Sequence, residues 1–137
     1  MNIINLENKR VVITGASKGL GSVCAKALAD CGARLVLIAR SKEKLETLRK
    51  SLKDAEKHIC IVADLTDRKQ LHECIKTAEE FLGFIDVVLH VVGGGLGLRD
   101  PLLEADDFIK LFTLNVLVAA EINRIIIPQM MKRGAGN

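Results

Sequence analysis

The residues with the clearest chemical signal form a glycine-rich turn near the start of the chain. Residues 14–21 read TGASKGLG, which spaces three glycines as G-x3-G-x-G between a β-branched run and a helical pattern. Gly15 permits a sharp exit from a strand, Gly19 lets the backbone approach a ligand without a Cβ in the way, and Gly21 lets helix and strand pack closely. The orphan N–H groups at the start of the helix favour a diphosphate at this point. We therefore expect a dinucleotide to bind here, against Gly15, Ser17, Lys18, Gly19, Leu20 and Gly21.

Two other phosphate-binding patterns do not fit this turn. It is neither the G-x-G-x-x-G of many dehydrogenases nor a G-x4-G-K-S/T loop, because Lys18 precedes Gly19 rather than following it. ATP hydrolysis is therefore disfavoured. A glycine-rich turn without a ligand is the remaining alternative, and the strand before it and the helix after it weigh against that interpretation.

Other reactive side chains give weaker signals. The four cysteines, Cys24, Cys31, Cys60 and Cys74, form no CxxC pair, which indicates a reduced, cytosolic protein. Cys24, Cys60 and Cys74 fall at or beside apolar positions of the expected helices and strands, so we expect them to be small core residues. The histidines lack metal-ligand spacing, so no metal site is expected: His58, His72 and His90. The sequence has no Tyr and no Trp, so these residues cannot supply a phenol as acid, base or nucleophile.

Alternating strands and helices must position the glycine turn. Short apolar runs predict strands over residues 10–14, 35–39, 59–63 and 87–92. Helical spacing predicts helices over residues 19–31, 45–52 and 71–82, and a long helix from about Glu104 to Met131, bent at Pro128 and ended by Gly134. The strands show little polar alternation, which indicates a parallel α/β sheet with both faces covered.

Composition sets the class of protein. A length of 137 residues allows one domain, 1–137, and 49% apolar with 27% charged residues is typical of a globular core. The net charge is +3 with scattered basic residues, which gives nucleic-acid binding no support. The longest apolar stretch, 122–131, is interrupted by polar residues and no signal peptide precedes the fold, so we expect a soluble cytosolic protein without a membrane partner.

Landmarks beyond the turn resemble the short-chain dehydrogenase/reductase family. Asp64 follows the third strand, Gly93 follows the fourth, and Asn115 lies on the long helix, in the family's order and approximate spacing. The resemblance covers the whole chain. Within the family, the chain is similar to NADP-dependent 3-oxoacyl-carrier-protein reductases. It implies a Rossmann-type doubly wound parallel sheet, here with its first four strands and their helices.

The resemblance also implies roles for single residues. Asp64 and Leu65 would contact the adenine, Gly93 would line the cofactor groove, and Asn115 would belong to the catalytic Asn-Ser-Tyr-Lys group. Asp64 could instead cap a helix, but Thr66 and Asp67 are better placed to do so. The family commonly shows Asn-Asn-Ala-Gly where this chain has His90-Val91-Val92-Gly93. His90, taken as a cofactor-groove residue, cannot offer an amide's donor and acceptor together, so we expect a looser tie to the neighbouring strands.

The end of the second strand favours NADP over NAD. NAD-preferring members place an acid there for the ribose hydroxyls, whereas this chain reads Ala39-Arg40-Ser41. Arg40 can form paired hydrogen bonds to a 2′-phosphate, and Lys18 can reach it from the glycine turn. The alternative is that both are solvated surface charges.

Most of the family's catalytic group has no counterpart here. Members use a Tyr, a Lys four residues later and a Ser, but this chain has no Tyr, and its serines, Ser17, Ser22, Ser41 and Ser51, all precede the third strand. We expect the N-terminal part of an NADP(H)-dependent oxidoreductase for a small carbonyl or alcohol substrate, truncated and inactive alone. The alternative is a non-catalytic NADP(H)-binding sensor or interaction module. An apolar open edge on the fourth strand favours truncation, and apolar surface on the long helix predicts a homo-oligomer at full length.

Overall fold

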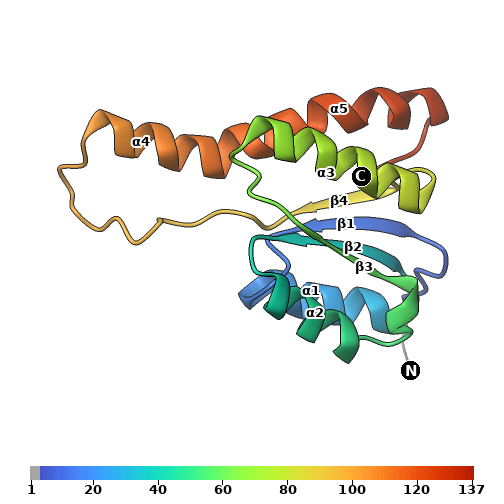
Figure 1. Ribbon diagram of the computed structural model, residues 1–137. Helices are drawn as coiled ribbons and strands as arrows, with labels where there is room; N and C mark the ends of the chain where they lie inside the picture. Colours follow the sequence, from blue (N-terminus) through green and yellow to red (C-terminus); the bar gives the residue numbers. More distant parts are fainter. Residues whose placement is uncertain (1–3) are drawn as a thin grey trace.

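Four parallel strands and the helices that connect them make up residues 4–137, the part of the chain that this computed structural model describes. The strands are β1 (Arg10–Thr14), β2 (Arg34–Ala39), β3 (Ile59–Val62) and β4 (Val87–His90). They pair in the order β3-β2-β1-β4, and every neighbouring pair is parallel (Figure 1). The chain thus builds outward from β1 to β3 and then crosses to the other side of β1. This order confirms the predicted doubly wound sheet.

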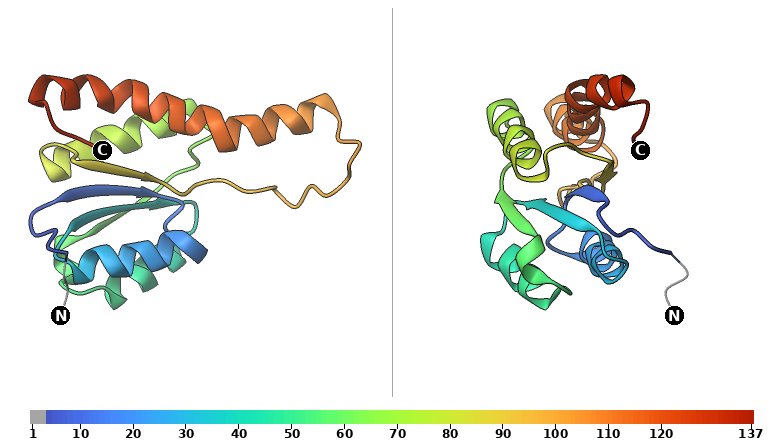
Figure 2. Two further views of the ribbon diagram at one scale, coloured as in Figure 1. Left: turned by 180° about the vertical axis from the view of Figure 1, so that it is seen from behind. Right: turned by 90° about the vertical axis from the view of Figure 1, so that its right-hand side faces the viewer.

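Helices cover both faces of this sheet (Figure 2). They are α1 (Gly19–Asp30), α2 (Lys42–Ser51), the 3-10 turn η1 (Ala55–Lys57), α3 (Arg68–Leu82), α4 (Ala105–Phe112), the π-helical segment η2 (Thr113–Leu117) and α5 (Val118–Arg133). Val11 and Ile13 pack with α1 and α2, whereas Val12 between them packs with α3 and α5. Because successive strand residues point to opposite faces, the central strands are buried on both sides.

The outer edge of β4 is not fully open. The Val88 N–H donates to the Asn137 carbonyl at 2.9 Å, and the Asn137 N–H donates to the Asp86 carbonyl at 2.9 Å. This is the bonding pattern of one parallel bridge. The sequence predicted an unpaired edge and a strand reaching residue 92. In the structure the edge is paired near its start and β4 ends at His90.

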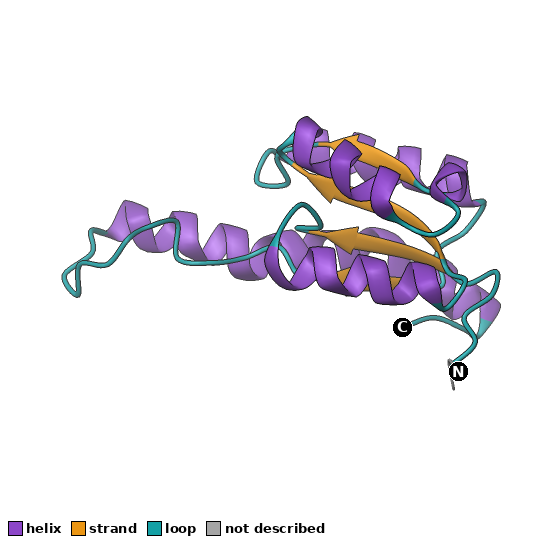
Figure 3. Cartoon of the chain, turned by 90° about the horizontal axis from the view of Figure 1, so that it is seen from below, coloured by secondary structure: helices purple, strands orange, loops and turns teal. Residues whose placement is uncertain are grey.

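The predicted long helix is one helical run over Ala105–Arg133. Gly134 ends it with φ of 66°, as expected from its left-handed backbone. Pro128 lies inside α5, and the helix continues past it to Arg133. The π-helical segment was not predicted. Together with the loop over residues 91–104, α4 extends beyond the carboxyl ends of the strands (Figure 3).

This helical run also has the length and apolar character of a membrane span. It is 29 residues long, and the most apolar 18-residue window has a mean hydropathy of 1.5. From the sequence we expected no membrane span, because the apolar stretch over residues 122–131 is interrupted by polar residues. Val118, Ile122 and Ile126 on the inner face of α5 are buried against the sheet. By length and composition alone, this run satisfies the criterion for a membrane span.

Candidate cofactor-binding site

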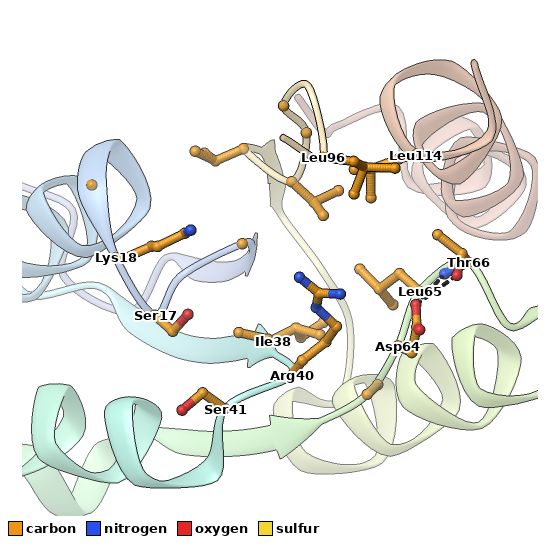
Figure 4. Close-up of a pocket in the computed structure, with 18 of the residues that line it drawn as sticks. Ser17, Lys18, Ile38, Arg40, Ser41, Asp64, Leu65, Thr66, Leu96 and Leu114 are labelled. Atoms are coloured by element: carbon orange, nitrogen blue, oxygen red, sulfur yellow. Dashed lines mark hydrogen bonds between the residues drawn. The ribbon is translucent and has the colours of Figure 1, made fainter. Parts of the chain in front are cut away.

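A groove of about 1210 Å³ lies at the carboxyl ends of the strands. Its walls come from the β1–α1 turn, the ends of β2 and β3, the glycine loop after β4 and the start of the long helix (Figure 4). Ligands of open α/β sheets bind at this edge, where the strand order reverses. Most of the predicted site residues line the groove: Gly15, Ser17, Lys18, Gly19, Leu20, Arg40, Asp64, Leu65 and Gly93. Gly21, His90 and Asn115 do not.

The three glycines of the turn have different structural roles. Gly15 has φ of 69°, and a Cβ there would lie 2.8 Å from the backbone nitrogen of Val92. Gly19 has φ of 54°, and no described atom lies within 4 Å of where its Cβ would be. A Cβ on Gly21 would collide with the Gly15 carbonyl oxygen. Gly15 and Gly21 are therefore required by packing inside the protein, whereas Gly19 leaves open space on the groove side, as the sequence predicted.

The start of α1 is free to bind an anion. Its N-cap residue, Lys18, makes no side-chain capping hydrogen bond. The first N–H groups of a helix need a partner from outside the helix, and the helix dipole makes an anion favourable there. The uncapped helix start beside Gly19 therefore fits a diphosphate.

Thr14 ties β1 to the end of β4, a role that the sequence argument missed. Its side chain is fully buried, and its Oγ1 accepts hydrogen bonds from the N–H groups of Val91 at 3.1 Å and Val92 at 3.3 Å. The same hydroxyl donates to the Leu89 carbonyl at 3.4 Å. A polar residue closing a buried apolar strand is the sequence signal that could have indicated this role.

His90 does not line the groove, and its predicted place among the cofactor-binding residues stays a prediction. Its Nε2 is 2.9 Å from Oδ1 of Asn123 on α5. The reason is strand alternation: Val88 packs on the α3 and α5 side, so His90 two residues later faces the same way. Thr14 holds the end of β4 through the neighbouring backbone groups of Leu89, Val91 and Val92.

Asn115 clamps the glycine loop without lining the groove. Its Oδ1 accepts from the Gly94 N–H at 2.9 Å, and its Nδ2 donates to the Gly94 carbonyl at 3.0 Å and to the Leu111 carbonyl at 2.8 Å. A Cβ on Gly93 would lie 2.8 Å from this Oδ1. Asn115 lies within the π-helical segment, a departure from α-helix that is frequent at functional sites. The resemblance singled out Asn115 for catalysis, and the structure adds this structural contact.

Positive side chains gather on one side of the groove. Lys18 and Arg40 both point into its open centre (Figure 4). Neither has an acidic partner among residues 4–137. No carboxylate stands at the end of β2, since Ala39, Arg40 and Ser41 occupy it. This arrangement can bind an anion that a ribose-binding acid would repel.

Asp64 lines the groove just after the end of β3. Its Oδ1 accepts from the N–H of Thr66 at 3.0 Å and from its hydroxyl at 2.7 Å. The cap of α3 is Asp67, which accepts from the N–H groups of Lys69 and Gln70. The hydrogen bond from Gln70 lowers the pKa of Asp67. Asp64 is thus not the helix cap, and Leu65 beside it lines the groove.

Two of the cysteines are poorly placed to react, and the described residues hold no metal-binding cluster. The four cysteines are free thiols, and burial raises the pKa of Cys60 to about 11 and that of Cys74 to about 12. Thiols with raised pKa values are poor nucleophiles. Among the described residues no group of three His, Cys, Asp or Glu side chains could hold a metal ion.

Comparison with known proteins places this geometry among oxidoreductases. A family model described as short chain dehydrogenase matches residues 9–137. Ketoacyl reductase HetN of Nostoc sp. is 34% identical over 132 residues, which cover 96% of this chain and 46% of that protein. The 3-ketodihydrosphingosine reductase of Mus musculus is 32% identical over 137 residues, covering 96% of this chain and 41% of that protein.

A solved structure gives the same result for the fold. A 7α-hydroxysteroid dehydrogenase, complexed with NADH and 7-oxo glycochenodeoxycholic acid, superposes with a TM-score of 0.89 at 26% identity. The match covers 96% of this chain and 52% of that structure. The chain therefore spans about half the length of the relatives that it matches.

Proposed function

Because this chain belongs to the short-chain dehydrogenase/reductase family, we propose that its groove binds NADP(H) and that it forms the cofactor-binding part of an oxidoreductase. When bound, the nicotinamide cofactor would donate or accept a hydride as a carbonyl and an alcohol interconvert. The open space at Gly19 and the uncapped start of α1 fit its diphosphate. Asp64 and Leu65 would hold the adenine.

The observation that carries the choice of NADP(H) is the pair of unpaired cations in the groove. Lys18 and Arg40 come from different elements, yet both line the groove, and no carboxylate stands at the end of β2. A guanidinium can bind a phosphate through two parallel hydrogen bonds, and a lysine adds a point charge. A cofactor without the 2′-phosphate would leave both cations without a partner.

Titration of the chain with NADPH and NADH tests this proposal. We expect saturable binding of both, tighter for NADPH, followed by cofactor fluorescence. Arg40→Ala should raise the Kd for NADPH by about tenfold or more, the size of a lost charge-assisted hydrogen bond, and leave the Kd for NADH nearly unchanged. Equal losses for both cofactors, or no saturable binding by the parent chain, would contradict it.

Asn115 is the one member of the predicted catalytic group that the chain contains, and we propose that it acts by holding the glycine loop. Without a Tyr, these residues have no phenol to exchange a proton with the substrate oxygen. We therefore propose that turnover needs residues beyond these 137. The relatives match 96% of this chain, which covers only 46% and 41% of their length, and this supports that proposal.

The same absence of Tyr favours a second candidate, an NADP(H)-binding module that does not catalyse. The mass of the protein from its native source distinguishes the two: a value well above 14.9 kDa supports the oxidoreductase, and 14.9 kDa supports the module. For either candidate we propose a cytosolic location, which the four free cysteines support. The exposed apolar surface of α4 and α5 supports a homo-oligomer.

A further inference from the structure

The first turn of α2 carries a charge pattern that opposes its own helix dipole. The helix begins Lys42-Glu43-Lys44, so two cations lie at its positive end. Its last turn follows the usual rule, with Arg49 and Lys50 near the negative end. Residue types that are unfavourable for the helix in which they lie are expected mainly at functional sites. An anion bound nearby would remove the conflict.

Lys44 lies at the junction of two hollows, and Lys42 lines neither. Lys44 lines the cofactor groove beside Arg40, and it also lines a smaller cleft of about 380 Å³ between α1 and α2. Ser17 is the other residue that borders both. The turn is fixed locally, because the Lys44 N–H donates to the Ser41 hydroxyl at 3.4 Å. No acidic side chain pairs with Lys44 within residues 4–137.

The neighbouring acid does not face the groove. Glu43 lines only the smaller cleft, together with Lys26. The groove side of this helix start is therefore positive, whereas its far side carries mixed charge. An anion entering beside Arg40 would meet Lys44 without an intervening carboxylate.

We infer that Lys44 is a third cation for the 2′-phosphate of NADP(H), beside Lys18 and Arg40, and helps to set cofactor specificity. The inference rests on the proposed function. A phosphate with close to two negative charges and three acceptor oxygens can take hydrogen bonds from several cations. The flexible side chain of a lysine lets its ammonium adjust to the position of the phosphate. The planar guanidinium of Arg40, in contrast, donates hydrogen bonds in fixed directions.

The test measures Kd for NADPH and NADH in Lys44→Gln, Lys44→Arg and Lys42→Gln. Both glutamine variants remove one positive charge from the same helical turn, but only Lys44 lines the groove. We expect Lys44→Gln to raise the Kd for NADPH by roughly fivefold to tenfold and to change that for NADH by less than about twofold. Lys44→Arg should keep most of the affinity for NADPH, and Lys42→Gln should bind both cofactors like the parent chain.

Salt dependence gives a second readout. The Kd for NADPH should rise less steeply with salt in Lys44→Gln than in Lys42→Gln, because one phosphate contact is missing. Equal effects of the two glutamine variants, or equal losses for both cofactors, would overturn the role of Lys44. If Arg40→Ala discriminates between the cofactors and Lys44→Gln does not, this inference fails and the proposed function stands. If the parent chain binds neither cofactor, both fail.

Discussion

Side chains that do not line the groove determine its shape. Thr14 holds the end of β4 beside β1 through two backbone N–H groups. Asn115 holds the glycine loop through both polar groups of Gly94. In each case one side chain replaces backbone pairing where the regular element has ended. The position of the groove wall therefore depends on residues that the cofactor need not touch.

Gly93 gives a test of the Asn115 clamp. A Cβ on Gly93 would lie 2.8 Å from Asn115 Oδ1, so Gly93→Ala must displace the amide that holds Gly94. We expect a loss of about 1 to 3 kcal/mol in the free energy of unfolding, as for other overpacked sites, and weaker binding of NADPH. Urea unfolding and cofactor titration measure the two effects.

The matched control for this change lies two residues along the same loop. A Cβ on Gly95 would come no closer than 3.9 Å to any described atom, the Leu98 carbonyl oxygen. Gly95→Ala should therefore leave stability and affinity nearly unchanged. Equal effects at the two glycines would show that loop flexibility, and not the contact with Asn115, is what Gly93 provides.

At the scale of elements, a buried histidine connects β2 to the chain before β3. His58 is only 3% exposed; its Nδ1 accepts from the Leu35 N–H at 3.1 Å, and its Nε2 is 2.9 Å from the Lys53 carbonyl. This pairing requires the neutral ring with its proton on Nε2. Burial lowers the pKa of His58 below its ordinary value. From the sequence, His58 was notable only for lacking metal-ligand spacing, and the structure gives it a structural role.

Acid should weaken the fold through His58. Above a pH of about 6.5 the ring is neutral in both states, so it adds no pH dependence. As pH falls below that value the unfolded chain takes up the proton first, and stability declines by up to about 1.4 kcal/mol per pH unit until the folded pKa is reached. Urea unfolding across this range should show the decline in the parent chain.

Variants separate His58 from other titrating groups. His58→Gln retains an amide donor and acceptor but cannot titrate, so it should lose stability overall and show a shallower acid decline. His72→Gln, at a side chain that is 43% exposed, should leave the decline in place. If His58→Gln keeps the full slope, the proton uptake belongs to another group.

The elements show which parts of the fold the sequence could predict. The strands and most helices follow from apolar runs and helical spacing, which are local signals. The glycine turn was predictable because its spacing and its flanking elements agree. The contacts of Thr14, Asn115 and His58 were not, because each joins segments that become neighbours only once the strand order is known. The π-helical segment had no recognisable signal in residue type.

At the scale of the whole molecule, exposed apolar side chains recur along the loop before α4 and the long helical run. Leu102, Phe108, Phe112 and Met131 are each more than half exposed along the loop and the long helical run. Exposed apolar patches of this kind mark contacts with other proteins or with membranes. The proposed homo-oligomer would cover this surface with a second copy, and the membrane-span character of Ala105–Arg133 is the competing explanation.

Phe108→Glu tests the homo-oligomer. We expect sedimentation of the parent chain to show mass increasing with concentration, and Phe108→Glu to shift the distribution toward 14.9 kDa, because a charge would be buried at the contact. Val23→Glu on α1 removes an equally exposed apolar side chain from the other helical layer and should not change the distribution. Binding of the parent chain to neutral lipid vesicles without self-association would favour the membrane instead.

Cofactor binding and turnover should be separable in this chain. The groove, its cations and its loop clamp lie within residues 4–137, but the sequence has no Tyr to exchange a proton with a carbonyl oxygen. General acid or base catalysis is typically worth about 10² to 10⁴ in rate. We expect NADPH to bind, while the rate of NADPH oxidation with a panel of small ketones stays at the level without protein.

Binding and oxidation measured on the same sample provide the control, since a misfolded chain would fail at both. Oxidation that depends on the ketone and is abolished by Arg40→Ala would show that these residues carry a catalytic group other than the family's tyrosine.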